Sequence, residues 1–375
     1  MLFTPARHEA ITSGRFSEAA ARDAIGRIAA RATREVDLTD APSGVYDGAA
    51  GVAWALHELA GDGQIERELV DALANAPDLD VEGVWNGVAG VLAVAEHCWP
   101  DAARRDRLAE LGRASLESPA LEPMYGHPGH MLLAAQLYAR TGEKRWAALW
   151  SAGAERLLRE WRRDDALGAW LWTQRLGAEE TRYVGAAHGL VGNAHVLLRG
   201  GALLSADQRD EVERRVVESL SRLAVVEDGR ANWPAVAGGP LAIRGRIRVQ
   251  WCHGAPGLLT ALWDVAPDDA AWDDLLLAAG RLVWEAGPIR DDPGLCHGTA
   301  GNAYALLALW RRTGDQRWLD RARAFAQHGA AQVEARATRL GYGRHSLFTG
   351  DEGVALCLAA CITGDERMPV ADRLI

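Results

Sequence analysis

Two short segments of this chain carry residues that could bind a soft metal ion. Cys252 lies in Trp-Cys-His-Gly-Ala-Pro-Gly, and Cys296 and His297 begin Cys-His-Gly-Thr-Ala-Gly-Asn. Two thiolates and one imidazole suit zinc, and three protein ligands leave a tetrahedral zinc with one open position, as in catalytic sites. The two segments are too far apart in the chain for a zinc finger or ribbon. A shared metal would therefore have to be assembled by the tertiary structure.

This ligand set favours activation of a thiol. Zinc with two thiolates and a neutral imidazole has a formal charge near zero, and the metal lowers the pKa of a substrate thiol without fully removing its nucleophilicity. Activation of water more often uses histidine-rich or carboxylate-containing sites, although some hydrolytic sites also have two cysteines and one histidine. An isolated Cys-His pair is usually structural, but the glycine-rich context repeated around both cysteines favours a metal site.

Two further residues are candidates for catalysis. His188, in Ala-Ala-His-Gly-Leu-Val-Gly, stands directly before a glycine, in the same register as His253 and His297. A histidine there can exchange a proton near neutral pH, although a capping or packing role is about as common. Arg248, four residues before Cys252, could stabilise negative charge, although an arginine in a loop more often forms a surface ion pair.

Both cysteine segments belong to a repeat that runs along the whole chain. Gly-x-x-Gly occurs seven times in matching contexts, and each copy leads into an apolar run of helix length. The first glycines of the copies are Gly48, Gly87, Gly126, Gly189, Gly254, Gly298 and Gly350. More amphipathic stretches lie between them and are predicted to form outer helices, for example residues 17–34, 102–116, 206–223 and 315–333.

The repeat predicts an all-α fold. Strand signals are scarce, and residues 243–249 are a short, isolated example. Seven inner helices, each preceded by an outer helix, can bury their apolar sides without exposed ends if they close into a ring. We therefore predict a single α/α-toroid domain over residues 1–375. All inner helices would begin at one mouth, where their positive ends favour anions and thiolates.

Two intervals between repeats are longer than the others. They contain residues 161–184, which lead to His188, and residues 226–250, which lead to Cys252. We expect these insertions to rim the cavity and select the substrate, because loops held by a rigid scaffold commonly carry specificity.

Composition limits the function classes. The net charge of −10 argues against general affinity for nucleic acid or anionic membranes. Five cysteines, an odd number without the dense spacing of secreted disulfide scaffolds, favour a reducing compartment. The sequence has no apolar signal core and no apolar stretch near the roughly 20 residues that span a bilayer. A cytoplasmic location is expected.

The motifs around Cys252, Cys296 and His188 resemble the defining segments of the lanthionine synthetase C (LanC) family, and the similarity extends over all seven repeats. The resemblance implies an α/α toroid with one zinc ion per chain. It assigns Cys252, Cys296 and His297 as zinc ligands, His188 as the proton-transfer residue and Arg248 as an active-site residue.

In bacterial members of the family, the thiolate of a peptide cysteine adds to dehydroalanine or dehydrobutyrine and closes a thioether ring. The resulting enolate then takes a proton at Cα, a step that we assign to His188. The chain has no room for a dehydratase or kinase domain, so a separate protein would have to supply the dehydroamino acid.

Two positions depart from the peptide cyclases. His253 replaces a common tyrosine, Glu122 stands where aspartate is frequent, and we expect both to contact substrate. These departures resemble the LanC-like branch, which is associated with addition of glutathione to dehydroamino acids in proteins. The thiol donor and the acceptor therefore stay open between a precursor peptide and glutathione with a protein.

Two other classes are alternatives. A carbohydrate-active toroid is suggested by the 15 tryptophans, but it would need a pair of carboxylates at the mouth. Asp47, Glu122, Asp351 and Glu352 lie near turns without forming a compelling pair. The remaining alternative is a scaffold that uses zinc only for stability.

Overall fold

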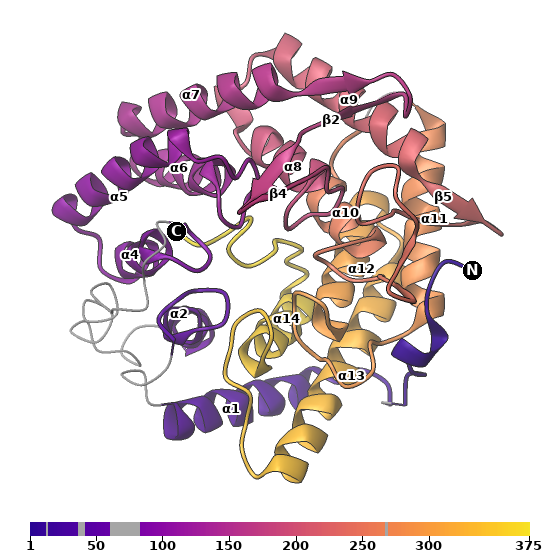
Figure 1. Ribbon diagram of the computed structural model, residues 1–375. Coiled ribbons are helices and arrows are strands. Elements are labelled where there is room, and N and C mark those ends of the chain that lie inside the picture. The colour runs from indigo at the N-terminus through magenta and orange to yellow at the C-terminus, as the bar shows by residue number, and fades with distance from the viewer. Residues whose placement is uncertain (13, 37–41, 61–82, 267–268) are drawn as a thin grey trace.

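The computed structural model describes residues 1–12, 14–36, 42–60, 83–266 and 269–375. Its inner helices form a ring, and each begins directly after the first glycine of a Gly-x-x-Gly copy, as predicted (Figure 1). These helices are α2 (Ala49–Ala60), α4 (Val88–Cys98), α6 (His127–Thr141), α8 (Leu190–Leu198), α10 (Ala255–Leu262), α12 (Thr299–Thr313) and α14 (Asp351–Thr363).

Outer helices surround this ring, and all but one of those described are longer and more amphipathic than the inner helices (Figure 1). They are α1 (Glu18–Glu35), α5 (Ala102–Ala114), α7 (Lys144–Glu160), α9 (Ala206–Leu223), α11 (Ala270–Ala286) and α13 (Gln316–Leu340). Each precedes an inner helix in the chain, and α1 packs against α14, so the first and last repeats meet. The outer partner of α4 would fall in residues 61–82, outside the described residues. The all-α toroid predicted from the repeat is confirmed.

The second glycine of each copy lets a loop cross the first turn of the inner helix. A Cβ atom at Gly90, Gly257 or Gly301 would lie 1.9 Å from the carbonyl oxygen of the residue six positions earlier. No side chain tolerates such a contact with backbone, so glycine is required by close approach rather than by helix propensity. The motif thus encodes the sharp entry from loop to inner helix.

A chain of backbone hydrogen bonds links successive turns. It joins the residues that stand two positions before the first glycine in five of the seven copies. The amide of Cys252 donates to the carbonyl of Cys296 (3.1 Å), Cys296 to Phe348 (2.9 Å), Phe348 to Tyr46 (3.0 Å) and Tyr46 to Trp85 (2.8 Å). These bonds run from the fifth turn through the seventh to the first and second. They therefore close the ring across the two ends of the sequence.

The long insertions fold into two-stranded antiparallel hairpins. Their strands are β1 (Arg162–Asp164), β2 (Ala169–Leu171), β3 (Gln174–Leu176), β4 (Glu179–Thr181), β5 (Val225–Glu227), β6 (Arg230–Asn232), β7 (Ala242–Ile243) and β8 (Arg246–Ile247). The strand signal at residues 243–249 thus becomes parts of β7 and β8. Short 3₁₀ turns at Pro5–Arg7, Ser115–Glu117 and Gly201–Leu203 complete the described elements.

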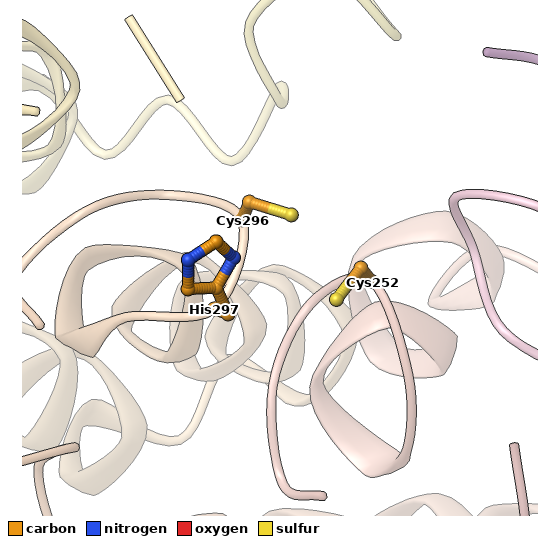
Figure 2. A group of neighbouring side chains, drawn as sticks. All are labelled: Cys252, Cys296 and His297. Carbon is orange, nitrogen blue, oxygen red and sulfur yellow. The ribbon is translucent and has the colours of Figure 1, made fainter. Parts of the chain in front are cut away.

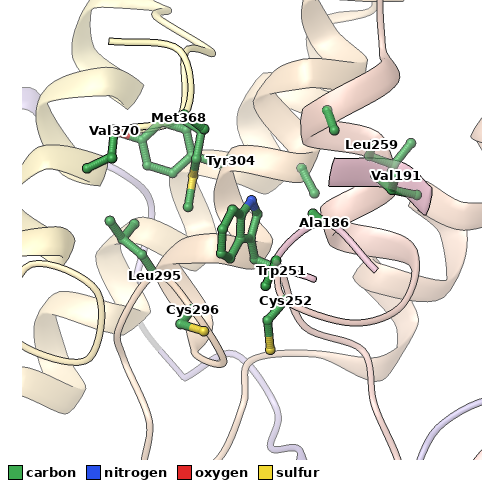
Figure 3. Close-up of a cluster of buried hydrophobic side chains, with 14 of the residues drawn as sticks. Ala186, Val191, Trp251, Cys252, Leu259, Leu295, Cys296, Tyr304, Met368 and Val370 are labelled. Atoms are coloured by element: carbon green, nitrogen blue, oxygen red, sulfur yellow. The ribbon is translucent and has the colours of Figure 1, made fainter. Parts of the chain in front are cut away.

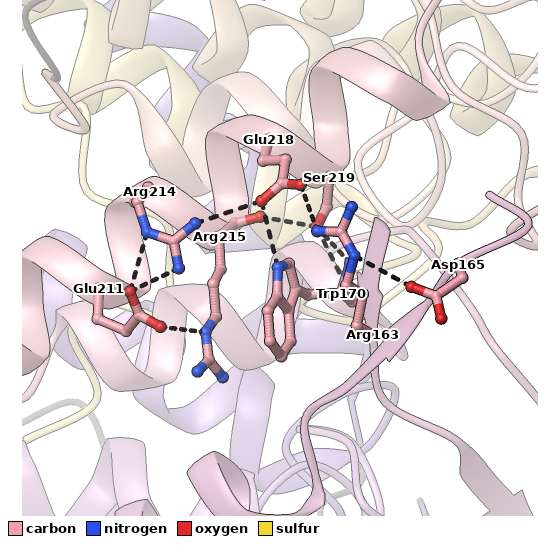
Figure 4. A network of polar contacts seen from close by, with 8 residues as sticks. All are labelled: Arg163, Asp165, Trp170, Glu211, Arg214, Arg215, Glu218 and Ser219. Carbon is pink, nitrogen blue, oxygen red and sulfur yellow. Dashed lines mark hydrogen bonds and ion pairs between the residues drawn. The ribbon is translucent and has the colours of Figure 1, made fainter. Parts of the chain in front are cut away.

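The first hairpin is fastened to the outer helix α9 (Figure 4). The Arg215 guanidinium lies 3.8 Å from the ring centroid of Trp170, whose indole N–H donates to Glu218 (3.2 Å). Glu218 also pairs with Arg163 at 2.6 Å. Trp170, which lies in the insertion expected to rim the cavity, therefore packs between the hairpin and the outer helix.

An apolar cluster fills the ring next to the two cysteines (Figure 3). Trp251 packs against Trp85 (5.8 Å between ring centroids) and Phe348 (5.4 Å). The segment that follows α14 enters the same cluster through Met368 and Val370. This packing fixes Trp251 and thereby the position of the neighbouring Cys252.

Candidate metal and active site

The structure brings the three predicted metal ligands together (Figure 2). One donor atom each from Cys252, Cys296 and His297 lies within 4.8 Å of the other two. Ligands of one zinc ion stand about 2.0–2.3 Å from the metal, so small side-chain movements would close this triad around it. Within the described residues, it is the only group of three or more such side chains that could hold a metal ion. The donor set and its geometry fit zinc.

Each ligand is placed by the turn that opens an inner helix. Cys252 precedes α10, and Cys296 and His297 precede α12, so the backbone bond between Cys252 and Cys296 joins the two turns directly. Both thiols are buried, whereas the His297 side chain is 37% exposed. The nearby positive helix ends favour negative charge at these turns.

Neighbouring side chains orient these ligands. The Gln250 amide N–H donates to Cys252 Sγ at 2.9 Å. Asp292 Oδ2 lies 3.3 Å from His297 Nε2, and a carboxylate in this position commonly orients a ligating imidazole. The hydrogen bond between the two thiols lowers the pKa of Cys252 and raises that of Cys296.

His188 is held by a buried carboxylate from the third repeat. Its Nδ1 lies 2.7 Å from Glu122 Oε2. Glu122 is 0% exposed and also accepts the backbone N–H groups of Met124 (3.0 Å) and Tyr125 (2.6 Å). The expected contact of Glu122 with substrate is not supported, because its carboxylate is enclosed and occupied by protein donors. Glu122 instead positions His188.

Aromatic rings surround His188. The Tyr125 ring stacks on it with centroids 5.8 Å apart, and Tyr183 lies at the same distance with a tilt of 47°. Tyr183 also contacts His253, whose ring is 6.3 Å from His188. The end of the first insertion thus reaches the site through Tyr183.

His253 and Arg248 lie on the Cys252 side of the site. Burial lowers the pKa of His253 to about 3, with Arg248 and His188 contributing, so this imidazole is neutral at pH 7. Arg248 is half-buried and does not line the cavity, but its charge helps to lower the pKa of Cys252 as well. His253 therefore lines the cavity. Arg248 lies outside the lining, and its positive charge lowers the pKa values of His253 and Cys252.

The site opens into a cavity of about 490 Å³. Apart from Pro42 and Gly44, its lining residues stand one or two positions before the first glycine of the first six copies. They are Tyr46, Asp47, Asn86, Met124, Tyr125, Ala187, His188, Cys252, His253, Cys296 and His297. The two insertions contribute no residue to this lining, but Tyr183 of the first contacts His188 and His253, and Gln250 of the second contacts Cys252. Their role in substrate selection stays a prediction. The register shared by His188, His253 and His297 could have identified Asp47, Asn86 and Tyr125 if it had been extended to the first three copies.

The fold and the site together define the class of protein. It is an α/α toroid that carries a candidate metal site of two cysteines and one histidine where its inner helices begin. The family described as lanthionine synthetase C-like protein matches residues 9–372, and the chain therefore belongs to this family. None of the helices in the described ranges is long and apolar enough to cross a membrane.

Curated relatives match parts of the chain. The protein named glutathione S-transferase LANCL1 from Danio rerio is 32% identical over 179 residues, which are 47% of this chain and 40% of the relative. LanC-like protein GCL1 from Arabidopsis thaliana is 36% identical over 151 residues, covering 40% of this chain and 33% of the relative. The chain thus spans less than half the length of these two relatives in the matched regions.

The fold is similar to a solved structure named nisin cyclase. The two share a TM-score of 0.67 at 16% sequence identity, over 92% of this chain and 94% of the other. At this identity, the similarity establishes the shared α/α toroid alone.

Proposed function

We propose that this protein adds a thiol to dehydroalanine or dehydrobutyrine and forms a thioether, using one zinc ion held by Cys252, Cys296 and His297. The observation that carries the proposal is the placement of this soft-ligand triad and the carboxylate-held His188 on one cavity. Family membership supports thiol addition as the general reaction.

Zinc in this site would supply a Lewis acid that favours the thiolate form of a substrate thiol. The buried positions of Cys252 and Cys296 and the Asp292 contact to His297 would keep the ligands preorganised. The remaining chemistry falls to the side chains of the cavity.

His188 is the proposed proton donor. When sulfur bonds to Cβ, the electron pair of the Cα=Cβ bond moves into an enolate, and Cα must then take a proton. Because Glu122 occupies Nδ1 of His188, Nε2 is the nitrogen that would deliver this proton. The thiol proton released at the start restores His188, so the overall addition is balanced.

His253 and Arg248 would act on the enolate oxygen. A neutral imidazole can donate a hydrogen bond to a carbonyl, and the low pKa of His253 keeps it neutral at pH 7. The positive charge of Arg248 interacts with His253 and would favour the negative charge that develops. His253 thus keeps its predicted contact with substrate as a proposal.

Glutathione is the first thiol donor to test. The relative named glutathione S-transferase LANCL1 and the His253 position both favour it, and the cavity volume is in the range that holds a small ligand. Ring closure within a precursor peptide is the second candidate, because the fold is shared with nisin cyclase. In either case, a separate dehydratase or kinase would have to make the dehydroamino acid.

The carbohydrate-active alternative loses its support. Asp351 pairs with Arg336, Glu352 holds His345 at 2.7 Å, and Glu122 holds His188. Among the described lining residues, Asp47 is the only carboxylate, so no catalytic pair faces the cavity.

The test combines purified protein, glutathione and a peptide that contains dehydroalanine. Mass spectrometry should detect a glutathione thioether that forms faster than the uncatalysed reaction, together with near-stoichiometric zinc by elemental analysis. A Cys252→Ala variant should lose both. Zinc-loaded protein that gives only the background rate with glutathione and with a cysteine peptide would support the scaffold that uses zinc only for stability.

A further inference from the structure

The proposed reaction raises a problem of selectivity, and the inference below rests on that function. Three sulfur atoms would share the site: Cys252, Cys296 and the substrate thiol. Each is a nucleophile toward dehydroalanine when ionised. Addition by a protein sulfur would join Sγ to Cβ, protonate Cα and leave the enzyme alkylated at a metal ligand. Something must restrict the reaction to the substrate sulfur.

Gln250 supplies a hydrogen bond to one protein sulfur. Its amide N–H donates to Cys252 Sγ at 2.9 Å. Both backbone groups of Gln250 are paired with His253: the Gln250 amide donates to the His253 carbonyl (3.2 Å), and the His253 amide donates back to Gln250 (3.1 Å). The turn therefore holds the Gln250 side chain beside the sulfur.

Two fully buried asparagines hold the residues just before Gln250. Asn302, on α12, donates to the carbonyl of Val249 at 3.0 Å. Asn232 donates to the carbonyl of Arg248 at 3.0 Å and accepts the amide of Ala255 at 3.0 Å. Neighbouring elements thus fix this segment on both sides. The contact between Gln250 and Cys252 belongs to a rigid frame rather than to a mobile surface loop.

Tyr46 supplies the corresponding contact to the other sulfur. The Tyr46 and Cys296 side chains line the same cavity and share a hydrogen bond. The Tyr46 ring stacks on Phe348 with centroids 5.2 Å apart and an angle of 13°. Its backbone amide and carbonyl both belong to the hydrogen-bonded ring of turns. Each protein sulfur therefore has its own positioned donor.

We propose that Gln250 and Tyr46 suppress the nucleophilicity of Cys252 and Cys296, so that the substrate sulfur is the one that adds to the dehydroamino acid. A hydrogen bond to a thiolate withdraws electron density from the sulfur, and hydrogen bonds to charged groups are stronger than neutral ones. Gln250 and Tyr46 are positioning residues, since they act through the metal ligands and not on the substrate.

Cobalt spectroscopy tests the two hydrogen bonds without any turnover. Co²⁺ replaces zinc in such sites, and its sulfur-to-metal charge-transfer bands report the electron density on the thiolates. Gln250→Leu and Tyr46→Phe should each move these bands to lower energy, because the freed sulfur is richer in electrons. Tyr183→Phe removes a hydroxyl beside His253 and no donor from sulfur, so its bands should stay in place. Unmoved bands in both test variants would overturn the proposal.

Self-alkylation tests the consequence. Zinc-loaded protein is incubated with a dehydroalanine peptide and no added thiol, and the modified cysteine is located by peptide mapping. Gln250→Leu should be alkylated at Cys252, and Tyr46→Phe at Cys296, on the order of tenfold faster than wild type, as expected for loss of a charged hydrogen bond. Equal rates in all three proteins would contradict the inference.

The two proposals fail in different ways. If wild type adds neither glutathione nor a peptide cysteine, the proposed function is wrong, and the cobalt bands still decide whether Gln250 and Tyr46 control the sulfurs. If wild type is active but neither variant differs in its bands or its alkylation, only the selectivity proposal is lost.

Discussion

Glu122 and His188 come from different repeats and share a hydrogen bond of 2.7 Å between Oε2 and Nδ1. A second hydrogen bond joins the same two turns. Asn193, on the helix that follows His188, donates to the carbonyl of Leu121 at 3.0 Å and so fixes the residue next to Glu122. The third and fourth turns therefore hold each other, and the orientation of His188 depends on the contact between these two repeats.

The Glu122→Gln substitution should lower kcat while zinc stays bound. A glutamine places an amide where the His188 ring and two backbone N–H groups need an acceptor, so the imidazole would lose its fixed orientation. We expect a fall of roughly tenfold to hundredfold, typical for loss of a residue that orients a functional histidine. Steady-state kinetics with parallel zinc analysis checks this. A larger effect on KM than on kcat would instead support contact between Glu122 and substrate.

The His188→Ala substitution should remove turnover and leave the metal site intact. Loss of a general acid typically costs about 10²–10⁴-fold in rate. The measurement is adduct formation at matched zinc content, with Glu122 unchanged. A variant that is zinc-replete and fully active would exclude His188 as the proton donor.

Cys252→Ala and Cys296→Ala should each lose zinc. Removing one thiolate leaves two protein ligands, too few for a tight site. Cys357→Ala is the matched control, since Cys357 is buried on α14 and accompanies no metal triad. Elemental analysis reports the metal, and chelation should lower the Tm of wild type, because bound metal stabilises the folded state. Equal zinc content in all three variants would refute the ligand assignment.

The burial of His127 leads us to expect that the folded protein loses stability in mild acid. Burial lowers the pKa of this histidine to about 3, and its Nδ1 shares a 2.8 Å hydrogen bond with Ser115 Oγ. The unfolded chain, with a pKa near 6.5, binds a proton more readily than the folded protein between about pH 6.5 and 3. Stability contributed by neutral His127 is therefore complete above about pH 6.5 and falls by up to about 1.4 kcal/mol per pH unit below it.

Urea unfolding at several pH values checks this expectation. His127→Gln can keep a hydrogen bond to Ser115 but does not titrate. Its unfolding free energy should fall less than that of wild type, by roughly 2 kcal/mol over the interval from pH 6.5 to 5. Parallel curves for the two proteins would show that His127 does not contribute.

Gly257→Ala should disturb the metal site through packing. The added Cβ would lie 1.9 Å from the Trp251 carbonyl oxygen and 2.9 Å from Ala186 Cβ, so the loop that carries Cys252 must move. We expect a loss of about 1–3 kcal/mol in stability, together with weaker zinc binding. Gly26→Ala is the matched control, because nothing lies within 4 Å of its Cβ position on α1 and the change should stabilise by roughly 0.5–1 kcal/mol. Equal Tm values and equal zinc content in the two variants would contradict this account.

Some features were predictable because their causes are local. Glycines at fixed spacing before apolar runs located the starts of the inner helices, since the close crossing of loop and helix needs glycine wherever it occurs. The types of Cys252, Cys296 and His297 also indicated a metal site before any distance was known. Zinc binding itself stays a prediction.

Other features depended on distant neighbours. Trp170 belongs to an insertion that we expected to rim the cavity, but Arg215 and Glu218 on another element hold it. Glu122 looked like a substrate contact until its buried partners were visible. Tyr46 carried no chemical pattern of its own, because its importance comes from meeting Cys296 across the junction between the first and last repeats.

The sequence by itself therefore determined the repeated helix starts, the mainly α composition and the residue types at the site. Only the tertiary structure decided which donor meets which sulfur, which carboxylate holds His188 and which residues face the cavity. The physical reason is that helix starts follow from contacts within a few residues. The site arises from closure of the ring, which places residues from opposite ends of the chain at adjoining turns.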